Sequence, residues 1–195
     1  MKMAGIPFQE TVLFLRKPGF DQNLSAFSSA GRVPVLVDGD INIWESLAIC
    51  EYLAERFPEQ CLWPKDRGMR AYARSISHEM HANFQALRQH LPCHFVARYQ
   101  NFSIPPEAQN DINRVLSIWS GCRQTHAKEG PFLFGRFSIA DAMYAPVVFR
   151  FLAYGVQVED LHRAYMDMIE KLPAAKEWVY AAKQETERIE AYEKK

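Results

Sequence analysis

Residues 31–46 constrain the fold of this chain more than any other stretch. They read Gly-Arg-Val-Pro-Val-Leu-Val-Asp-Gly-Asp-Ile-Asn-Ile-Trp-Glu-Ser. Two short β-branched runs flank an Asp-Gly-Asp turn, and these residues tolerate the positive φ that tight hairpin turns require. Apolar residues then recur at helical spacing until Pro58, namely Leu47, Ile49, Leu53 and Phe57. The stretch therefore predicts strand, turn, strand and helix in succession.

Val33-Pro34 stands directly before the first of these strands. Proline supplies no backbone donor and is kept out of central positions in a sheet. A cis Val33–Pro34 peptide is one solution, since it costs little for an X-Pro bond and turns the chain sharply. The backbone N–H and C=O of Val33 would then be unpaired, and a peptide-like ligand could pair with them as an added strand.

Glu45-Ser46 opens the helix that follows the hairpin. Free N–H groups, a hydroxyl and the positive end of the helix dipole meet there, and together they favour a carboxylate. The two ends of the hairpin segment thus predict two parts of one binding site for a peptide-like acid.

These residues resemble the glutathione site in the thioredoxin-like domain of cytosolic glutathione transferases. In that family the residue before the cis-proline pairs with the cysteinyl backbone of glutathione, and the Glu-Ser pair holds its γ-glutamyl end. The resemblance implies binding positions at Val33, Pro34, Glu45 and Ser46, with glutathione as co-substrate. Arg32 is a further candidate, because its charge either reaches the glycyl carboxylate or lies in solvent.

Composition indicates an intracellular protein of one or two compact domains. The 195 residues can bury a sizeable core, and 23 Lys and Arg balance 23 Asp and Glu, so no global field attracts nucleic acid or anionic lipid. The four cysteines show neither paired spacing nor a CxxC, which favours reduced thiols. No stretch approaches the roughly 18 apolar residues of a membrane span, and the N-terminus has no signal-peptide pattern. We expect a cytoplasmic protein without membrane or nucleic-acid partners.

The first residues of the chain read as the end of a helix followed by a strand. Gly5 suits the C′ position of a helix end, and Ile-Pro leads into a strand predicted at residues 10–15. In the glutathione transferase family, which this chain resembles, a first strand and most of a first helix come before this point. They carry the Tyr, Ser or Cys that hydrogen-bonds the glutathione sulfur, so the resemblance leaves the catalytic residue of this chain unknown.

The family's first strand is central in its sheet, between the strands expected at residues 10–15 and 35–37. Each ladder group left unpaired costs roughly 1–3 kcal/mol, against a total stability of about 5–15 kcal/mol for a typical domain. Three explanations stay open: a start site placed too late, a truncated protein, or a replacement strand from a partner chain.

From residue 69 onward the pattern changes to long amphipathic helices. Apolar periodicity predicts them at residues 69–91, 105–124, 161–172 and 174–191. Turn formers without periodicity at residues 59–68 indicate a linker. With the resemblance, the fold class is an α/β thioredoxin-like domain at residues 1–60, N-terminally incomplete, followed by an all-α domain at residues 69–195.

The best local signature of the second domain is Gly135-Arg-Phe-Ser-Ile-Ala-Asp-Ala142. Ser138 can cap a helix N-terminus while Asp141 reaches back to the Ser138 N–H, which makes a capping box with aspartate in place of glutamate. Asp141 is then structural rather than catalytic. Glutathione transferases open the buried helix of their second domain with such a box, so the resemblance extends over nearly the whole chain.

Other residues invite a site assignment that their spacing does not support. His78 and His81 are one residue short of the HExxH zinc motif, and Pro92 separates His90 from His94, so we expect no metal site. The resemblance points to an electrophile pocket lined by residues that could equally be core, namely Met80, Phe84, Arg88, Tyr144 and Phe149.

The resemblance implies a homodimeric transferase that lowers the thiol pKa of glutathione and directs the thiolate at a small electrophilic substrate. Two alternatives stay open: a glutathione-dependent isomerase of maleylacetoacetate type, and a non-catalytic glutathione-binding or scaffold module. The missing first strand favours the non-catalytic module if the start of the chain is genuine. Val33-Pro34 with Glu45-Ser46 argues against a purely structural helical protein.

Overall fold

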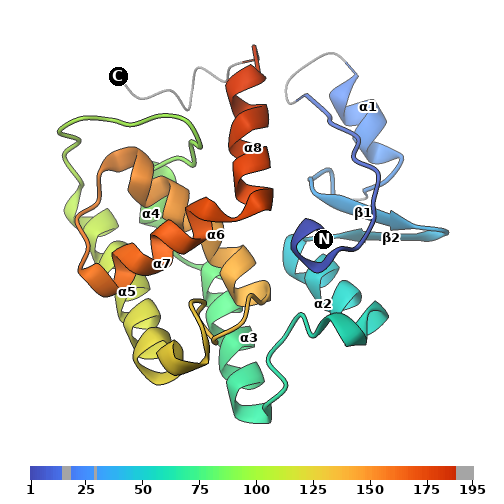
Figure 1. Cartoon of the computed structure of the whole chain (residues 1–195). Helices are drawn as coiled ribbons and strands as arrows, with labels where there is room; N and C mark the ends of the chain where they lie inside the picture. The colour runs from blue at the N-terminus through green and yellow to red at the C-terminus, as the bar shows by residue number, and fades with distance from the viewer. Residues whose placement is uncertain (15–18, 29, 188–195) are drawn as a thin grey trace. The chain divides into compact units, whose positions relative to one another are not determined.

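The computed structural model describes residues 1–14, 19–28 and 30–187 (Figure 1). The described residues up to Leu62 form one compact unit and those from Trp63 onward form a second, here called unit 1 and unit 2. Unit 1 combines a small sheet with short helices, and unit 2 is helical. The fold class expected for this chain, a small α/β domain followed by an all-helical domain, is confirmed.

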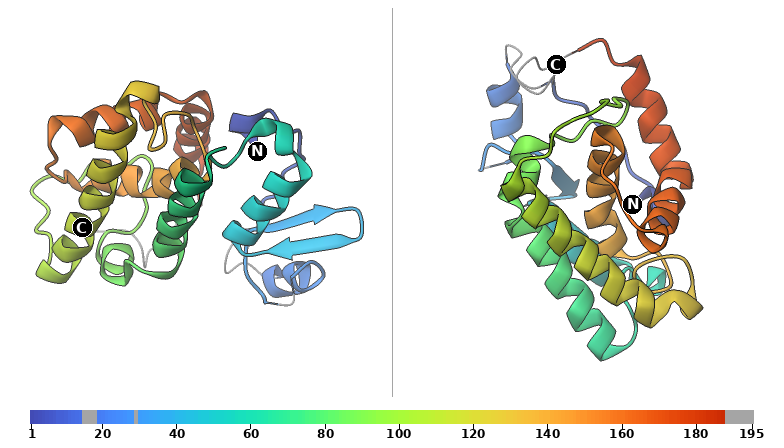
Figure 2. Two further views of the ribbon diagram at one scale, coloured as in Figure 1. Left: turned by 90° about the horizontal axis from the view of Figure 1, so that it is seen from below. Right: turned by 90° about the vertical axis from the view of Figure 1, so that its left-hand side faces the viewer.

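Unit 1 is built around the hairpin that the sequence predicts. Its elements are η1 (Lys2–Ala4), α1 (Phe20–Ser25), β1 (Val35–Asp38), β2 (Ile41–Trp44), α2 (Ser46–Arg56) and η2 (Pro58–Gln60). The strands are antiparallel, with Val35 opposite Trp44 and Asp38 opposite Ile41, and Gly39 adopts a φ of 60° in the turn. The hairpin packs against α2 (Figure 2, left), where the Tyr52 hydroxyl donates to Asp38 at 2.6 Å.

The chain ahead of the hairpin differs in part from its prediction. Gly5 caps the 3₁₀ helix η1 in the left-handed conformation, as expected of a helix end. The strand expected at residues 10–15 is wrong for residues 10–14, which form none, and residue 15 lies outside the described chain. A strand needs a neighbour to pair with, and the two described strands pair with each other. Val12 and Phe14 accordingly remain 61% and 51% exposed.

Unit 2 packs its helices around one aromatic core. The helices are α3 (Arg67–Ala82), α4 (Gln85–His90), α5 (Pro106–His126), η3 (Ala127–Glu129), α6 (Ile139–Tyr154), α7 (Asp160–Lys171) and α8 (Pro173–Gln184). The fully buried Trp119 on α5 contacts the rings of Tyr144, Phe151 and Tyr165 at centroid distances of 5.0–6.1 Å. Helices α3 and α5 run side by side (Figure 2, right) and are joined by the bidentate Arg114–Glu79 pair.

The helix expected at residues 69–91 is two helices, because the chain breaks at Asn83 and Phe84. Asn83 is extended and Phe84 has a φ of 61°. Two side chains stabilise the break: the nearby Arg88 guanidinium donates to the carbonyls of Met80 and Asn83, and the Asp111 carboxylate of α5 accepts the Leu87 N–H at 2.9 Å. Backbone groups freed by the break are thus paired.

The helix expected at residues 174–191 is shorter than predicted. It ends at Gln184, residues 185–187 are not helical, and residues 188–191 lie outside the described chain. Helix α8 has no fully buried residue, so little packing supports a longer helix. None of the described helices combines the length and the apolar composition that a membrane span requires.

The capping box at the start of α6 is confirmed. The Asp141 carboxylate accepts the Ser138 N–H at 2.9 Å and the Leu133 N–H at 3.0 Å. It also accepts the hydroxyls of Ser138 at 3.0 Å and Tyr165 at 3.3 Å. Burial nevertheless raises the pKa of Asp141 to about 6, which these four donors offset only in part.

Candidate functional site

The candidate site begins where the chain enters β1. The Val33–Pro34 peptide is cis, as predicted from the sequence. Val33 is 49% exposed, and its backbone N–H and C=O make no hydrogen bond to another described residue. An unpaired, accessible donor and acceptor on one residue can pair with an extended peptide.

The second part of the site is the N-terminus of α2. Glu45 is the N-cap, with a φ of 68°, and its carbonyl accepts the Ile49 N–H at 3.0 Å. No side chain caps this helix end. Ser46, the first helical residue, is half-buried. Helix α2 therefore presents uncapped N–H groups, a hydroxyl and a positive dipole end to an anion.

The hairpin brings these two parts together. Val35 pairs with Trp44 in the strand register, so the residues just before β1 and just after β2 lie at the same end of the sheet. This end therefore gathers the cis-proline segment and the Glu45-Ser46 helix start. Arg32 is exposed there, with its backbone N–H 3.5 Å from the Ser28 hydroxyl.

The residues considered for an electrophile pocket belong to the core of unit 2. Met80, Phe84, Tyr144 and Phe149 are buried, and the Tyr144 hydroxyl donates to the Ile76 carbonyl at 3.1 Å. The Arg88 guanidinium donates hydrogen bonds to the carbonyls at the end of α3. Their packing gives them a structural role within this unit.

Cys50, Cys93 and Cys122 do not present an activated thiol. All four cysteines of the chain are unpaired. Burial raises the pKa of Cys50 in unit 1, partly opposed by the α-amino group of Met1. It also raises the pKa of Cys93, and that of Cys122 to about 12. A raised pKa keeps a thiol protonated and weakly nucleophilic. Within the described part of the chain, no group of three or more His, Cys, Asp or Glu residues is arranged to hold a metal ion.

Two family models match the chain. The model "Glutathione S-transferase, N-terminal domain" matches residues 1–56, and "Glutathione S-transferase, C-terminal domain" matches residues 78–179. The second match alone covers more than half of the chain. The chain therefore belongs to the glutathione S-transferase family.

Curated relatives include plant and animal proteins. The chain is 43% identical over 60 residues to glutathione S-transferase Z1 of Arabidopsis thaliana, covering 31% of this chain and 27% of that protein. It is 25% identical over 151 residues to a zeta class glutathione S-transferase of Euphorbia esula, covering 76% and 64%. It is 46% identical over 78 residues to a probable maleylacetoacetate isomerase of Caenorhabditis elegans, covering 40% and 36%. The matched stretches thus span from about a quarter to just under two thirds of these relatives.

Solved structures share the fold. Glutathione S-transferase 1-6 of Anopheles dirus species B superposes with a TM-score of 0.74 at 19% identity, covering 95% of this chain and 88% of that one. A bacterial maleyl pyruvate isomerase of the zeta class gives 0.70 at 21% identity, covering 94% and 90%. A glutathione transferase homologue from Burkholderia, solved with bound glutathione, gives 0.69 at 24% identity, covering 94% and 88%.

Proposed function

We propose that the chain binds glutathione at the hairpin end of unit 1 and joins it, through its sulfur, to a small electrophilic substrate. The observation that carries this proposal is the register that brings an unpaired Val33 backbone and the uncapped start of α2 to one end of the sheet. Membership of the glutathione S-transferase family supports the choice of ligand.

Each part of glutathione has a complementary group in the proposed site. The backbone of Val33, held by cis Pro34, pairs with the cysteinyl peptide as a short added strand. The γ-glutamyl carboxylate is bound at the N-terminus of α2 by N–H groups and the Ser46 hydroxyl, while Glu45 attracts the ammonium group. In this proposal the Arg32 guanidinium pairs with the glycyl carboxylate.

The chemistry is nucleophilic attack by the glutathione thiolate. The thiolate forms the new bond to carbon, and the electrophile releases its leaving group with the bonding electron pair. No residue of the chain is assigned to activate the sulfur. We further propose that the chain forms a homodimer in the cytoplasm. The four cysteines are unpaired, and thiols stay reduced in that compartment.

A second candidate is a glutathione-dependent isomerase. It is favoured by the 46% identity to a probable maleylacetoacetate isomerase over 78 residues. In such a reaction glutathione adds to the substrate and leaves again. Free thiol is therefore consumed by a transferase and regenerated by an isomerase, and a thiol assay during turnover separates the two. Binding with neither activity would identify a non-catalytic module.

The binding site is tested by calorimetric titration of glutathione into the full chain. Glu45→Gln combined with Ser46→Ala should weaken binding more than tenfold, because both polar groups at the start of α2 are altered. Tenfold corresponds to about 1.4 kcal/mol of binding free energy. Ser117→Ala changes an exposed serine on α5 of unit 2 and should leave the affinity unchanged. An unaltered affinity in the double variant would place glutathione elsewhere.

A further inference from the structure

No described residue pairs with the backbone of residues 8–14 in unit 1. These residues lie between η1 and α1 and form neither helix, strand nor turn (Figure 1). Their backbone N–H and C=O groups make no hydrogen bond to another described residue. The side chains of Phe8, Val12 and Phe14 are exposed. The segment thus combines unpaired backbone groups with exposed apolar surface, a combination that folded chains normally avoid.

The sequence of this segment favours a strand. Thr11, Val12 and Phe14 belong to the residue types that are enriched in strands. Val12 and Phe14 are two residues apart, so a strand would present both side chains on one face. The segment therefore has the composition of a strand and needs only an edge with which to pair.

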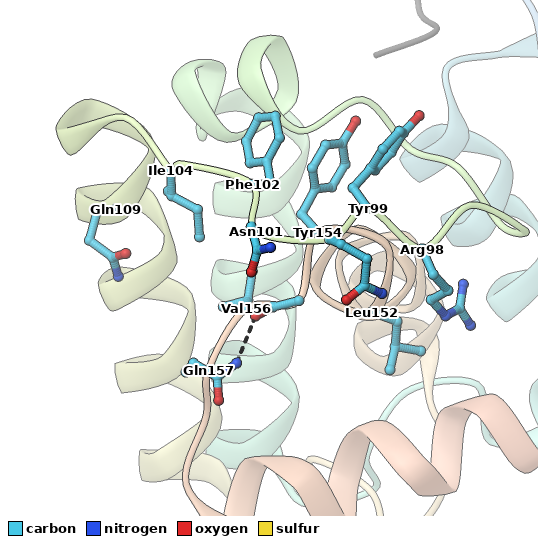
Figure 3. A pocket seen from close by; sticks show the side chains of 12 residues that line it. Arg98, Tyr99, Asn101, Phe102, Ile104, Gln109, Leu152, Tyr154, Val156 and Gln157 are labelled. Carbon is cyan, nitrogen blue, oxygen red and sulfur yellow. Dashed lines mark hydrogen bonds between the residues drawn. The ribbon is translucent and has the colours of Figure 1, made fainter. Parts of the chain in front are cut away.

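An irregular segment of unit 2 shows the usual arrangement. The loop at residues 98–104 also lacks helix and strand, but its Tyr99 N–H donates to the Ala153 carbonyl at 2.7 Å. Figure 3 shows Tyr99 and Phe102 beside Tyr154, and their ring centroids lie 4.8 and 4.7 Å from the Tyr154 centroid. Backbone pairing and ring contacts anchor this loop, whereas residues 8–14 have no comparable backbone anchor in the described chain.

The hairpin of unit 1 offers a free edge for a strand. A two-residue loop joins β1 to β2, so Asp38 and Ile41, which flank the loop, form a hydrogen-bonded pair. Hydrogen-bonded pairs alternate along antiparallel strands, and the N–H and C=O groups of Val35 and Val37 therefore point away from β2. No described residue pairs with this outer edge of β1.

The hairpin also has an apolar face that α2 leaves uncovered. Helix α2 contacts the opposite face, where the Tyr52 hydroxyl donates to Asp38. Val37 and Trp44 share the uncovered face through the strand register, and both side chains are exposed. A strand added to the outer edge of β1 would place an apolar side chain such as Val12 beside Val37, and such cross-strand pairs stabilise sheets.

The donor strand and the accepting edge belong to the same chain, which favours a second copy as the occupant of the edge. A strand from a different protein would fill the edge of β1 and leave residues 8–14 unpaired. Two copies that exchange these residues satisfy both surfaces and close with twofold symmetry. Residues 15–34 connect the segment to β1 and give it reach, and the balance of 23 basic and 23 acidic residues leaves no net charge to repel a second copy.

We propose that two copies of this chain associate by exchanging residues 10–14, which each copy adds as a third strand to the outer edge of β1 in the other. The contact lies entirely within unit 1. It assigns a surface to the homodimer proposed above and rests on that proposal.

The dependence of association on protein concentration tests the contact. Sedimentation of the full chain should show a monomer–dimer equilibrium. Hydrogen exchange followed by mass spectrometry should slow at residues 10–14 and 35–38 as the concentration rises from about 1 to about 100 µM, because dimer formation follows mass action. Exchange in α6 should not change. Glutathione is left out, so that the result does not depend on the proposed ligand site.

Thr11→Pro and Val12→Pro test the strand pairing itself. Proline removes a backbone donor, and neither N–H is used within one chain, so the monomer loses no hydrogen bond. Adjacent N–H groups of a strand point to opposite edges. One of the two variants should therefore raise the dimer dissociation constant at least tenfold. Thr11→Val and Val12→Ile keep the donors and should leave the constant unchanged, and matching circular dichroism spectra show that all four variants are folded.

Several results would overturn the strand exchange. A chain that stays monomeric would overturn both this contact and the proposed homodimer. A dimer that is protected only outside residues 10–14 and 35–38, or that tolerates both proline substitutions, would leave the homodimer standing and overturn this contact. Protection of residues 10–14 that does not change with concentration would show that they pair within one chain. Assemblies that grow beyond the dimer would contradict a closed exchange.

Discussion

At the scale of single residues, Asp141 shows how a motif acquires a further role from its surroundings. The capping box accounts for its bond to the Ser138 N–H. Bonds to the Leu133 N–H and the Tyr165 hydroxyl are additional, and they tie the loop before α6 and the helix α7 to one carboxylate. Asp141 is fully buried, so its ionisation is linked to the stability of unit 2.

The pKa of Asp141 predicts how stability changes with pH. Burial raises it from 3.8 to about 6, so between these values the folded chain holds a proton that the unfolded chain releases. The contribution of this group is therefore complete below about pH 4 and is lost as pH rises through about 6, by an amount on the order of 3 kcal/mol. Urea denaturation from pH 4 to 7, compared with Asp141→Asn, isolates this dependence.

Asp141→Asn should lower stability at pH 4, where the contribution of the carboxyl group is complete. One acceptor oxygen becomes an NH₂ group, which faces donors and leaves at least one of them unpaired, at roughly 1–3 kcal/mol. The difference in stability between parent and variant should shrink as pH rises from 4 to 7. A constant difference would show that the carboxyl group does not titrate in this range.

At the scale of elements, the break between α3 and α4 depends on a residue from another helix. Leu87 sits in the first turn of α4, and its N–H is satisfied by Asp111 of α5 rather than by a local cap. The N-cap position itself is Phe84, which provides no side-chain acceptor. Asp111 therefore performs the capping function from 24 residues away.

Asp111→Ala should destabilise unit 2 by about 0.5–2 kcal/mol, the usual loss on removal of an N-cap side chain. Asn110→Ala changes the adjacent exposed residue and is the matched control. Urea unfolding of both variants provides the measurement. Equal losses in the two would mean that the Asp111 bond to α4 contributes nothing.

The turn before α6 depends on close backbone contact. A Cβ on Gly130, where φ is 143°, would lie 2.2 Å from the Gly135 carbonyl oxygen. Gly130→Ala should therefore cost roughly 1–3 kcal/mol in backbone strain and a further amount of about 1–3 kcal/mol in overpacking. Gly155 also has a positive φ, but a Cβ there would meet no atom closer than 4.0 Å. Gly155→Ala should therefore lower the free energy of unfolding only by backbone strain, about 1–2 kcal/mol. Thermal unfolding that ranks the two equally would contradict the contact.

At the scale of the whole molecule, the chain divides into two units with different architectures. Unit 1 holds the proposed glutathione site on a two-stranded hairpin. Unit 2 holds the aromatic core around Trp119. A ligand of one unit should therefore leave a signature in that unit.

Glutathione should protect the amides of unit 1 from hydrogen exchange. A ligand that binds only the folded state stabilises it by mass action, by about 2.7 kcal/mol at a free concentration 100 times its Kd. Mass spectrometry should show slower exchange at residues 35–56 and little change in α6. No protection at residues 35–56 under saturating glutathione would refute the site.

The features that could be predicted from sequence are local ones. The hairpin and the cis-proline segment depend on turn chemistry and X-Pro geometry within sixteen consecutive residues, the helix α2 depends on the apolar periodicity that follows them, and the capping box depends on two residues three apart. The candidate binding residues Arg32, Val33, Pro34, Glu45 and Ser46 could be named for the same reason. Their roles toward glutathione stay predictions.

The remaining features depend on contacts between distant parts of the chain. The helix break at Phe84 needs Asp111, and residues 10–14 form no strand because no described neighbour pairs with them. The loop at residues 98–104 has no periodicity, yet the Tyr99 N–H donates to the Ala153 carbonyl 54 residues away. Sequence by itself determined the elements whose hydrogen bonds close within a turn or hairpin. Tertiary structure alone decided where backbone groups without a local partner would find one.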